Sequence, residues 1–281
     1  MGTSSSSGGA PSNVPMTPPW VPDPLPPPDG QDGDDNQAPD GANADPSAPD
    51  TGPPIIAPRG RFGPARRSLG QFAGSGSSSD MRRGVGHYVR KGLGGSASAS
   101  RRLAGTARTA GSLYGALSAT AEGRPSEPGS PLDPDRLAGR SATDIMDAVV
   151  EAVRPVDGTQ DAEASRKAIR DGLADLLDRY PEADLLNLGE EERLFVIERY
   201  IAQDVYGRLI LDVGRAVQDK APNPSAALSR LRQIKEYIRE TISARFRQVR
   251  SAASILTPRS VAEMATRAMR QAFEVFEEYI Q

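Results

Sequence analysis

The chain has 281 residues, of which 37% are hydrophobic and 5% aromatic, with 28 glycines, 25 prolines and a formal net charge of -3. This composition predicts that part of the chain cannot bury a hydrophobic core. The lack of cysteine and the single histidine exclude disulfides, thiolate metal sites and histidine-rich metal centres, so we expect neither a metal nor a cofactor.

Hydropathy favours a cytoplasmic location. No apolar run approaches the ~20 residues that span a bilayer, and the N-terminus lacks the charged start and apolar stretch of a secretory signal. We therefore expect a cytoplasmic protein without a stable membrane anchor. The oligomeric state stays open.

Charge is distributed unevenly along the chain. Residues 1–57 contain eight Asp and no Lys, Arg or Glu, whereas residues 58–124 contain twelve Lys and Arg against two acidic residues. An acidic tail therefore precedes a basic middle segment, and a mild acidic excess returns in residues 125–281.

Residues 1–57 are expected to form a long disordered tail. Pro, Gly, Asp and Ser dominate it without hydrophobic periodicity. It therefore has too little apolar surface to offset the ~1–2 kcal/mol per residue of backbone entropy lost on ordering. Trp20, the only tryptophan, lies between prolines and is interpreted either as a docking anchor for a partner or as a solvated linker residue.

Gly2 is the candidate modification site. Met1 is expected to be removed before so small a residue, which leaves a free and unhindered glycine amine. Three interpretations stay open: modification of the tail by another enzyme, an unmodified solubilising tail, and N-myristoylation. Gly2 and Ser6 fit the myristoylation pattern, although one acyl chain anchors only weakly.

Residues 58–124 are expected to form a basic, Gly/Arg-rich and weakly helical interaction segment. The pattern Arg-Arg-x-x-Gly begins at Arg66, Arg82 and Arg101. Each copy predicts a short amphipathic helix of low stability, because glycine costs a helix interior roughly 0.5–1 kcal/mol relative to alanine. We therefore expect these helices to fold on a partner surface. The candidate partner-binding residues of this segment are Arg66, Arg67, Arg82, Arg83, His87, Tyr88, Arg101 and Arg102.

Two kinds of partner fit this basic segment. A partner protein is the favoured interpretation. Paired arginines beside aromatic residues also suit phosphate contacts and base stacking, although no nucleic-acid-binding motif accompanies them. A solvated linker, a contact with the acidic tail and membrane-surface binding are the remaining interpretations.

Residues 125–140 contain four prolines and predict a linker. After it, residues 141–281 predict an all-α bundle of five amphipathic helices. The first begins with a Ser141 and Asp144 capping pair and ends near Pro155, the second covers 161–179, and the third begins at Glu190.

The last two helices have the clearest start signals in the chain. Asn223-Pro224 and Thr257-Pro258 each place a capping residue before a proline at the first helical position. The helix from Pro224 also carries seven basic residues between Arg230 and Arg250, which indicate either a solvated face or a surface for phosphate or an acidic partner. Its predicted apolar face is Leu228, Leu231, Ile234, Ile238, Ile242, Phe246 and Val249.

No catalytic motif is present in the sequence. It has neither a Walker-type phosphate loop nor a Gly-x-Ser-x-Gly elbow, and one histidine cannot form a His-Glu-x-x-His pair. We therefore expect a protein that is not an enzyme and has no catalytic residues.

Several strings resemble the QatB family of the Qat anti-phage system. The likeness begins with Met-Gly-Thr-Ser and Pro18-Pro19-Trp20 and extends through most of the chain. Its other strings are Gly60-Arg61-Phe62-Gly63, Leu69-Gly70-Gln71-Phe72, Gly86-His87-Tyr88-Val89, Gly129-Ser130-Pro131-Leu132-Asp133, the run 154–161 and Asp184-Leu185-Leu186-Asn187-Leu188.

This resemblance implies a defence component that acts with three other proteins. They are an ATPase (QatA), a QueC-like protein of the deazaguanine-synthesis type (QatC) and a TatD-like nuclease (QatD). The QueC-like partner implies that a deazaguanine-type group is joined to the glycine amine of Gly2. The alternative function is a nucleic-acid-binding adaptor whose arginine repeats deliver the partner nuclease.

Overall fold

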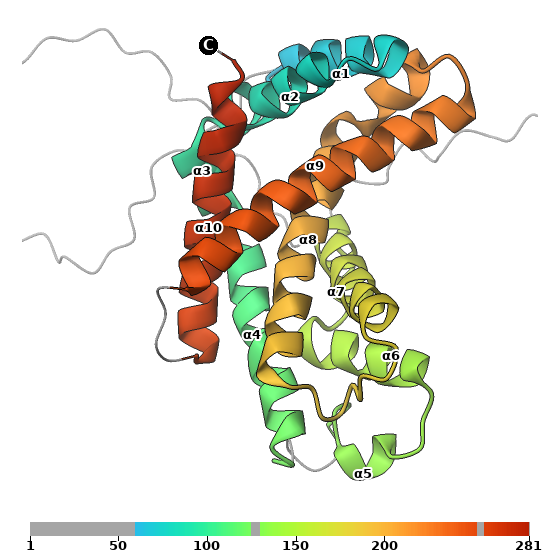
Figure 1. Cartoon of the computed structure of the whole chain (residues 1–281), viewed down its shortest axis with the longest axis vertical. Coiled ribbons are helices and arrows are strands. Elements are labelled where there is room, and N and C mark those ends of the chain that lie inside the picture. The colour runs from blue at the N-terminus through green and yellow to red at the C-terminus, as the bar shows by residue number, and fades with distance from the viewer. Residues whose placement is uncertain (1–59, 125–129, 252–255, 281) are drawn as a thin grey trace, which may run out of the picture. The chain divides into compact units, whose positions relative to one another are not determined.

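Every regular element that the structure describes is a helix (Figure 1). The computed structural model describes residues 60–124, 130–251 and 256–280, and no strand occurs among them. The predicted all-α fold is therefore confirmed. The helices are α1 (Gly63–Ser75), α2 (Ser78–His87), the π-helix η1 (Tyr88–Gly92), α3 (Ser96–Arg102), α4 (Ala104–Ala121), α5 (Pro134–Leu137), α6 (Ala142–Val153), α7 (Gln160–Arg179), α8 (Glu190–Lys220), α9 (Pro224–Arg250) and α10 (Pro258–Glu278).

The helix starts follow the capping signals of the sequence. Asn223 accepts a hydrogen bond from the amide of Ala226 at 2.8 Å, and α9 begins at the next residue, Pro224. Thr257 accepts one from the amide of Ser260 at 3.1 Å at the start of α10. Such side chains satisfy amides that have no partner within the first helical turn. Ser141 does the same for the amide of Asp144 at the start of α6, which confirms the predicted capping pair.

The long helix α8 is the centre of the packing. It packs against α7, α9, α1 and α4, and Figure 1 shows it running beside α4 and α7 while α9 crosses it. Burial on several sides explains why its apolar stripe, which includes Leu194, Val205 and Val217 at helical spacing, is buried along the whole helix.

The basic segment shares the hydrophobic core of the bundle. Helices α1 and α4 pack against α8, and α2, α3 and α4 pack against α10. Leu69, Phe72, Leu113 and Leu117 of this segment are fully buried, and all described residues belong to one compact unit. The partner surface that these weak helices need is therefore supplied by α8 and α10 of the same chain.

Glycines let the helices of the basic segment approach their neighbours closely. A Cβ atom added at Gly111 of α4 would lie 2.4 Å from the backbone oxygen of Pro258 in α10. One added at Gly86 of α2 would lie 2.5 Å from the backbone oxygen of Phe276. Residues that weaken an isolated helix thus permit its packing in the folded chain.

The predicted linker 125–140 is partly structured. Residues 125–129 lie outside the described residues, but residues 130–140 include the short helix α5. Leu132, just before this helix, and Leu137, its last residue, are both buried. This proline-rich stretch therefore contributes side chains to the core.

A buried polar network connects three helices of the bundle. Asp204 of α8 is 0% exposed; its carboxylate accepts a hydrogen bond from the Thr106 hydroxyl of α4 at 2.5 Å and one from Nε of Arg208 at 3.2 Å. Arg208 also donates to Asp161 of α7 at 3.0 Å. Pairing of this kind compensates for the cost of burying a carboxylate.

Candidate functional site

Two of the predicted partner-binding residues are used within the chain. Arg66 of α1 donates from Nε and Nη2 to the backbone oxygen of Asp212 in α8, at 3.2 and 2.8 Å. The Tyr88 hydroxyl donates to the Asp212 carboxylate at 2.9 Å, and burial together with this negative charge raises the pKa of Tyr88 well above its ordinary value. Both residues therefore attach the basic segment to α8.

Arg82 of the second arginine pair contacts α9 and the end of α10, whereas Arg83 is exposed and forms an ion pair with Asp80 of α2 at 3.4 Å. Arg82 stacks over the rings of Tyr237 and Tyr279, with its guanidinium carbon 5.9 and 5.2 Å from their centroids. His87 is half-buried, and burial followed by the charges of nearby cations, Arg83 first, lowers its pKa. A histidine with a lowered pKa is mostly neutral near pH 7, so His87 adds little positive charge to this surface.

The remaining predicted arginines face solvent. Arg67, Arg101 and Arg102 are exposed, and Arg101 donates to the hydroxyl of Ser98 at 3.0 Å. All six predicted arginines are thus exposed, and the structure separates Arg66 and Arg82, which contact other helices, from the rest instead of gathering them into one site. Gly2 and Trp20 lie outside the described residues.

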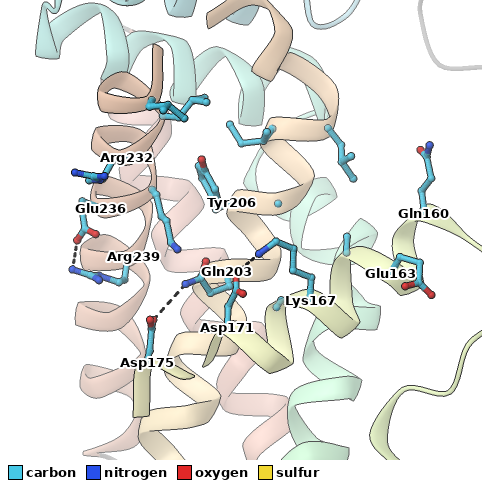
Figure 2. A pocket seen from close by; sticks show the side chains of 18 of the residues that line it. Gln160, Glu163, Lys167, Asp171, Asp175, Gln203, Tyr206, Arg232, Glu236 and Arg239 are labelled. Carbon is cyan, nitrogen blue, oxygen red and sulfur yellow. Dashed lines mark hydrogen bonds and ion pairs between the residues drawn. The ribbon is translucent and has the colours of Figure 1, made fainter. Parts of the chain in front are cut away.

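A large concave surface of the described residues is a groove between α7, α8 and α9, with a volume of about 990 Å³ (Figure 2). It forms because α7 and α9 both pack against α8, which leaves one face of α8 between them as the floor. A groove of this size falls in the range of small-molecule and peptide sites, and its open side suits an elongated ligand.

The groove exposes large apolar side chains to solvent. Leu211 of α8 is 58% exposed and Leu228 of α9 is 66% exposed, and both line it together with Ile210 and Leu231. Leu228 was predicted to lie on the buried face of its helix, and this prediction is wrong. It lies in the first turns of α9, where it lines the open groove instead of the core.

The two walls of the groove carry opposite charges. Figure 2 shows Glu163, Lys167, Asp171 and Asp175 along α7 and basic side chains along α9. On the α7 wall, Lys167 forms an ion pair with Asp171 at 2.6 Å, and the Gln203 amide nitrogen donates to Asp175 at 3.4 Å. This wall keeps a net negative charge.

The α9 wall is positive. Arg232, Lys235 and Arg239 line it, and Arg239 forms an ion pair with Glu236 of the same helix. Part of the basic face predicted for this helix therefore borders the groove. An apolar floor between one acidic and one basic wall matches an amphipathic helix whose apolar stripe has acidic residues on one side and basic residues on the other.

The described residues contain no grouping of metal-ligand type. Among residues 60–124, 130–251 and 256–280, no cluster of three or more His, Asp and Glu side chains is placed to hold a metal ion. None of the helices in the same stretches combines the length and apolarity needed to cross a membrane.

One sequence signal pointed to the groove, although helical periodicity alone could not show that it marks a surface site: the position of Leu211. Leu211 lies off the apolar stripe of α8, so a large hydrophobic side chain falls on a polar face of that helix. An exposed apolar residue of this kind indicates a contact surface when others join it in space. Leu228 joins it only through the packing of α9 on α8, which periodicity does not predict.

Over the residues that the structure describes, the fold and the groove define a helical protein with an open, amphipathic inter-helix groove on its surface. The chain also matches the family model described as Qat anti-phage system associated protein QatB over residues 94–276. This match covers well over half of the chain, so the protein belongs to the QatB family and is a component of an anti-phage defence system. Neither a comparison with curated proteins nor one with solved structures gave a match.

Proposed function

We propose that the chain is a non-enzymatic interaction subunit of the Qat system that binds an amphipathic helix of another Qat protein in the α7–α8–α9 groove. The observation that carries this proposal is the pair of exposed leucines, Leu211 on the α8 floor and Leu228 on α9, in a groove with oppositely charged walls. Large exposed apolar side chains with a polar rim are typical of protein contact surfaces.

Burial of these leucines supplies the affinity in this proposal. Covering an exposed leucine contributes about 1.5–3 kcal/mol, and anchors of this kind dominate the energy of helix-in-groove complexes. The charged walls fix the orientation of the bound helix, since reversing it would bring like charges together.

The groove is tested by co-purification of the full chain with each co-expressed Qat partner: the QatA-like ATPase, the QueC-like QatC and the TatD-like nuclease QatD. The variants Leu211→Glu and Leu228→Glu are expected to weaken one of these complexes at least tenfold, as measured by titration of the purified proteins. Ala244→Glu is the matched control, because Ala244 is exposed on α9 and does not line the groove. If all three variants kept their helical content and bound the Qat partners equally well, the groove would not be the binding site.

The second part of the proposal concerns Gly2 as a substrate. The QueC-like partner joins a deazaguanine-type group to the Gly2 amine, and the modified protein then acts inside the cytoplasm with its Qat partners. Support comes from the family match and from the Met1-Gly2 start, which offers an unhindered amine once Met1 is removed. In this proposal, the exposed Arg67, Arg101 and Arg102 contact partner proteins.

A further inference from the structure

A second and smaller cavity lies where the end of α7, the first turns of α8 and the end of α9 meet. Its volume is about 230 Å³, and it lies apart from the groove. Polar side chains dominate its wall, and guanidinium groups outnumber carboxylates by four to two. The charged residues that line it are Arg179, Glu191, Glu198, Arg199, Arg247 and Arg250.

Both carboxylates of this cavity already have partners. Arg250 pairs with Glu191 through two nitrogens, one of them at 2.8 Å, and these hydrogen bonds lower the pKa of Glu191. Nε of Arg247 lies 3.5 Å from a carboxylate oxygen of the buried Glu198. Arg247 and Arg250 are therefore paired with carboxylates, and Arg179 and Arg199 are not.

The two remaining arginines stack on one aromatic ring. The guanidinium carbons of Arg199 and Arg179 lie 4.6 and 5.7 Å from the ring centroid of Phe195. Among the residues that the structure describes, no carboxylate lies within ion-pair distance of either one. Nε of Arg179 donates to the Tyr180 hydroxyl at 3.2 Å. The other N–H groups of Arg179 and the N–H edges of Arg199 are available for an anion.

The position of Arg199 differs from that of the other three arginines, because it does not lie at a helix end. Arg179, Arg247 and Arg250 lie in the last turns of α7 and α9, where a cation interacts favourably with the helix dipole. Arg199 instead lies inside α8 and is half-buried. Burial lowers its pKa, and the opposing charge of the nearby Glu198, which already pairs with Arg247, only partly offsets this effect.

We propose that this cavity is a binding site for a phosphate monoester, held mainly by Arg199 and Arg179. A monoester carries a charge of about -1.5 to -2 near neutral pH, which matches the two guanidinium groups without carboxylate partners. Its several acceptor oxygens suit the forked N–H edges of stacked arginines. Two guanidinium groups already stack on Phe195, so the site recognises the phosphate group and not an aromatic base.

The test is a titration of the full chain with inorganic phosphate and with adenosine 5′-monophosphate, followed through the arginine Nε–Hε signals in NMR spectra. Adenosine, which lacks the phosphate, is the ligand control. Saturable shifts of the Arg199 and Arg179 signals with both phosphate probes are expected, and none with adenosine. Absence of saturation with phosphate, or equal shifts with adenosine, would overturn the proposal.

Variants assign the site within the same titration. Arg199→Gln and Arg179→Gln are each expected to weaken phosphate binding at least tenfold. Arg215→Gln is the matched control, because Arg215 lies on α8, is almost fully exposed and does not line the cavity. Its affinity should stay within twofold of the unaltered chain. Unchanged phosphate affinity in both cavity variants would mean that the two arginines only pack on Phe195. If a variant failed to fold, the titration of the unaltered chain would still test the proposal.

Discussion

Gly111→Ala tests whether the basic segment is an integral part of the folded chain. Gly111 lies within α4, and a Cβ atom there would lie 2.4 Å from the backbone oxygen of Pro258 and 3.1 Å from Cβ of Ala262 in α10. A backbone oxygen cannot rotate away, so α4 and α10 must separate, and overpacking of this kind costs typically 1–3 kcal/mol. Alanine returns about 0.5–1 kcal/mol through its higher helix propensity. The free energy of unfolding should therefore fall by about 1–2 kcal/mol.

Gly207→Ala is the matched control in another helix interior. A Cβ atom added at Gly207 of α8 meets no other atom within 4 Å, so this variant should gain about 0.5–1 kcal/mol of unfolding free energy. Both variants are compared with the unaltered chain by urea unfolding followed by far-ultraviolet circular dichroism. If Gly111→Ala stabilised the chain as Gly207→Ala does, α4 would not be packed on α10, and a segment that folds only on a partner would be favoured.

Three further predictions concern charged groups. Arg208→Leu should lower the free energy of unfolding by about 3 kcal/mol, because it leaves the fully buried Asp204 carboxylate without its cation; urea unfolding that changes by less than ~1 kcal/mol would contradict this. The folded chain holds His87 with a pKa below its ordinary 6.5, so the unfolded chain binds more protons and the free energy of unfolding decreases as the pH falls below that value. His87→Gln should reduce this loss of stability between pH 7 and 5. An unchanged loss would exclude His87 as its cause. Arg101→Ala combined with Arg102→Ala should leave single-stranded DNA binding unchanged in fluorescence anisotropy, whereas weaker binding with a shallower salt dependence would favour the nucleic-acid adaptor.

The bundle helices were predictable because their signals are local. The capping residues Asn223 and Thr257, each followed by proline, determine helix starts through hydrogen bonds within one turn, and the structure has α9 and α10 beginning at those prolines. The buried stripe of α8 follows from helical periodicity alone. Neither inference needs information about the rest of the chain.

The packing of the basic segment was not predictable from local patterns. Its helices are rich in Gly, Ala and Ser, which give a weak hydrophobic signal and low intrinsic helix stability. Their stability comes from close approach to α8 and α10, which glycine at positions such as 86 and 111 permits. Because close approach depends on residues distant in sequence, the same glycines indicated weak helices when the chain was considered segment by segment.

The groove also arises only from tertiary structure. The exposed leucines of the groove come from two different helices, and Leu228 fits the apolar pattern of α9 as well as any core residue does. Only the position of α7 and α9 on α8 shows that this leucine is exposed. The basic residues of α9 were predicted as a charged face, but the acidic α7 wall opposite them depends on the fold.

The most direct measurement for the proposed function is mass spectrometry of the intact chain and of its N-terminal peptide, after expression with and without the QueC-like partner. Gly2→Ala is the control, since alanine also allows removal of Met1 but places a methyl group beside the amine. The proposal predicts a mass addition on the Gly2 peptide that requires the partner and is lost or strongly reduced in Gly2→Ala. An unmodified Gly2 in the presence of an active partner would contradict the role of this chain as a protein substrate.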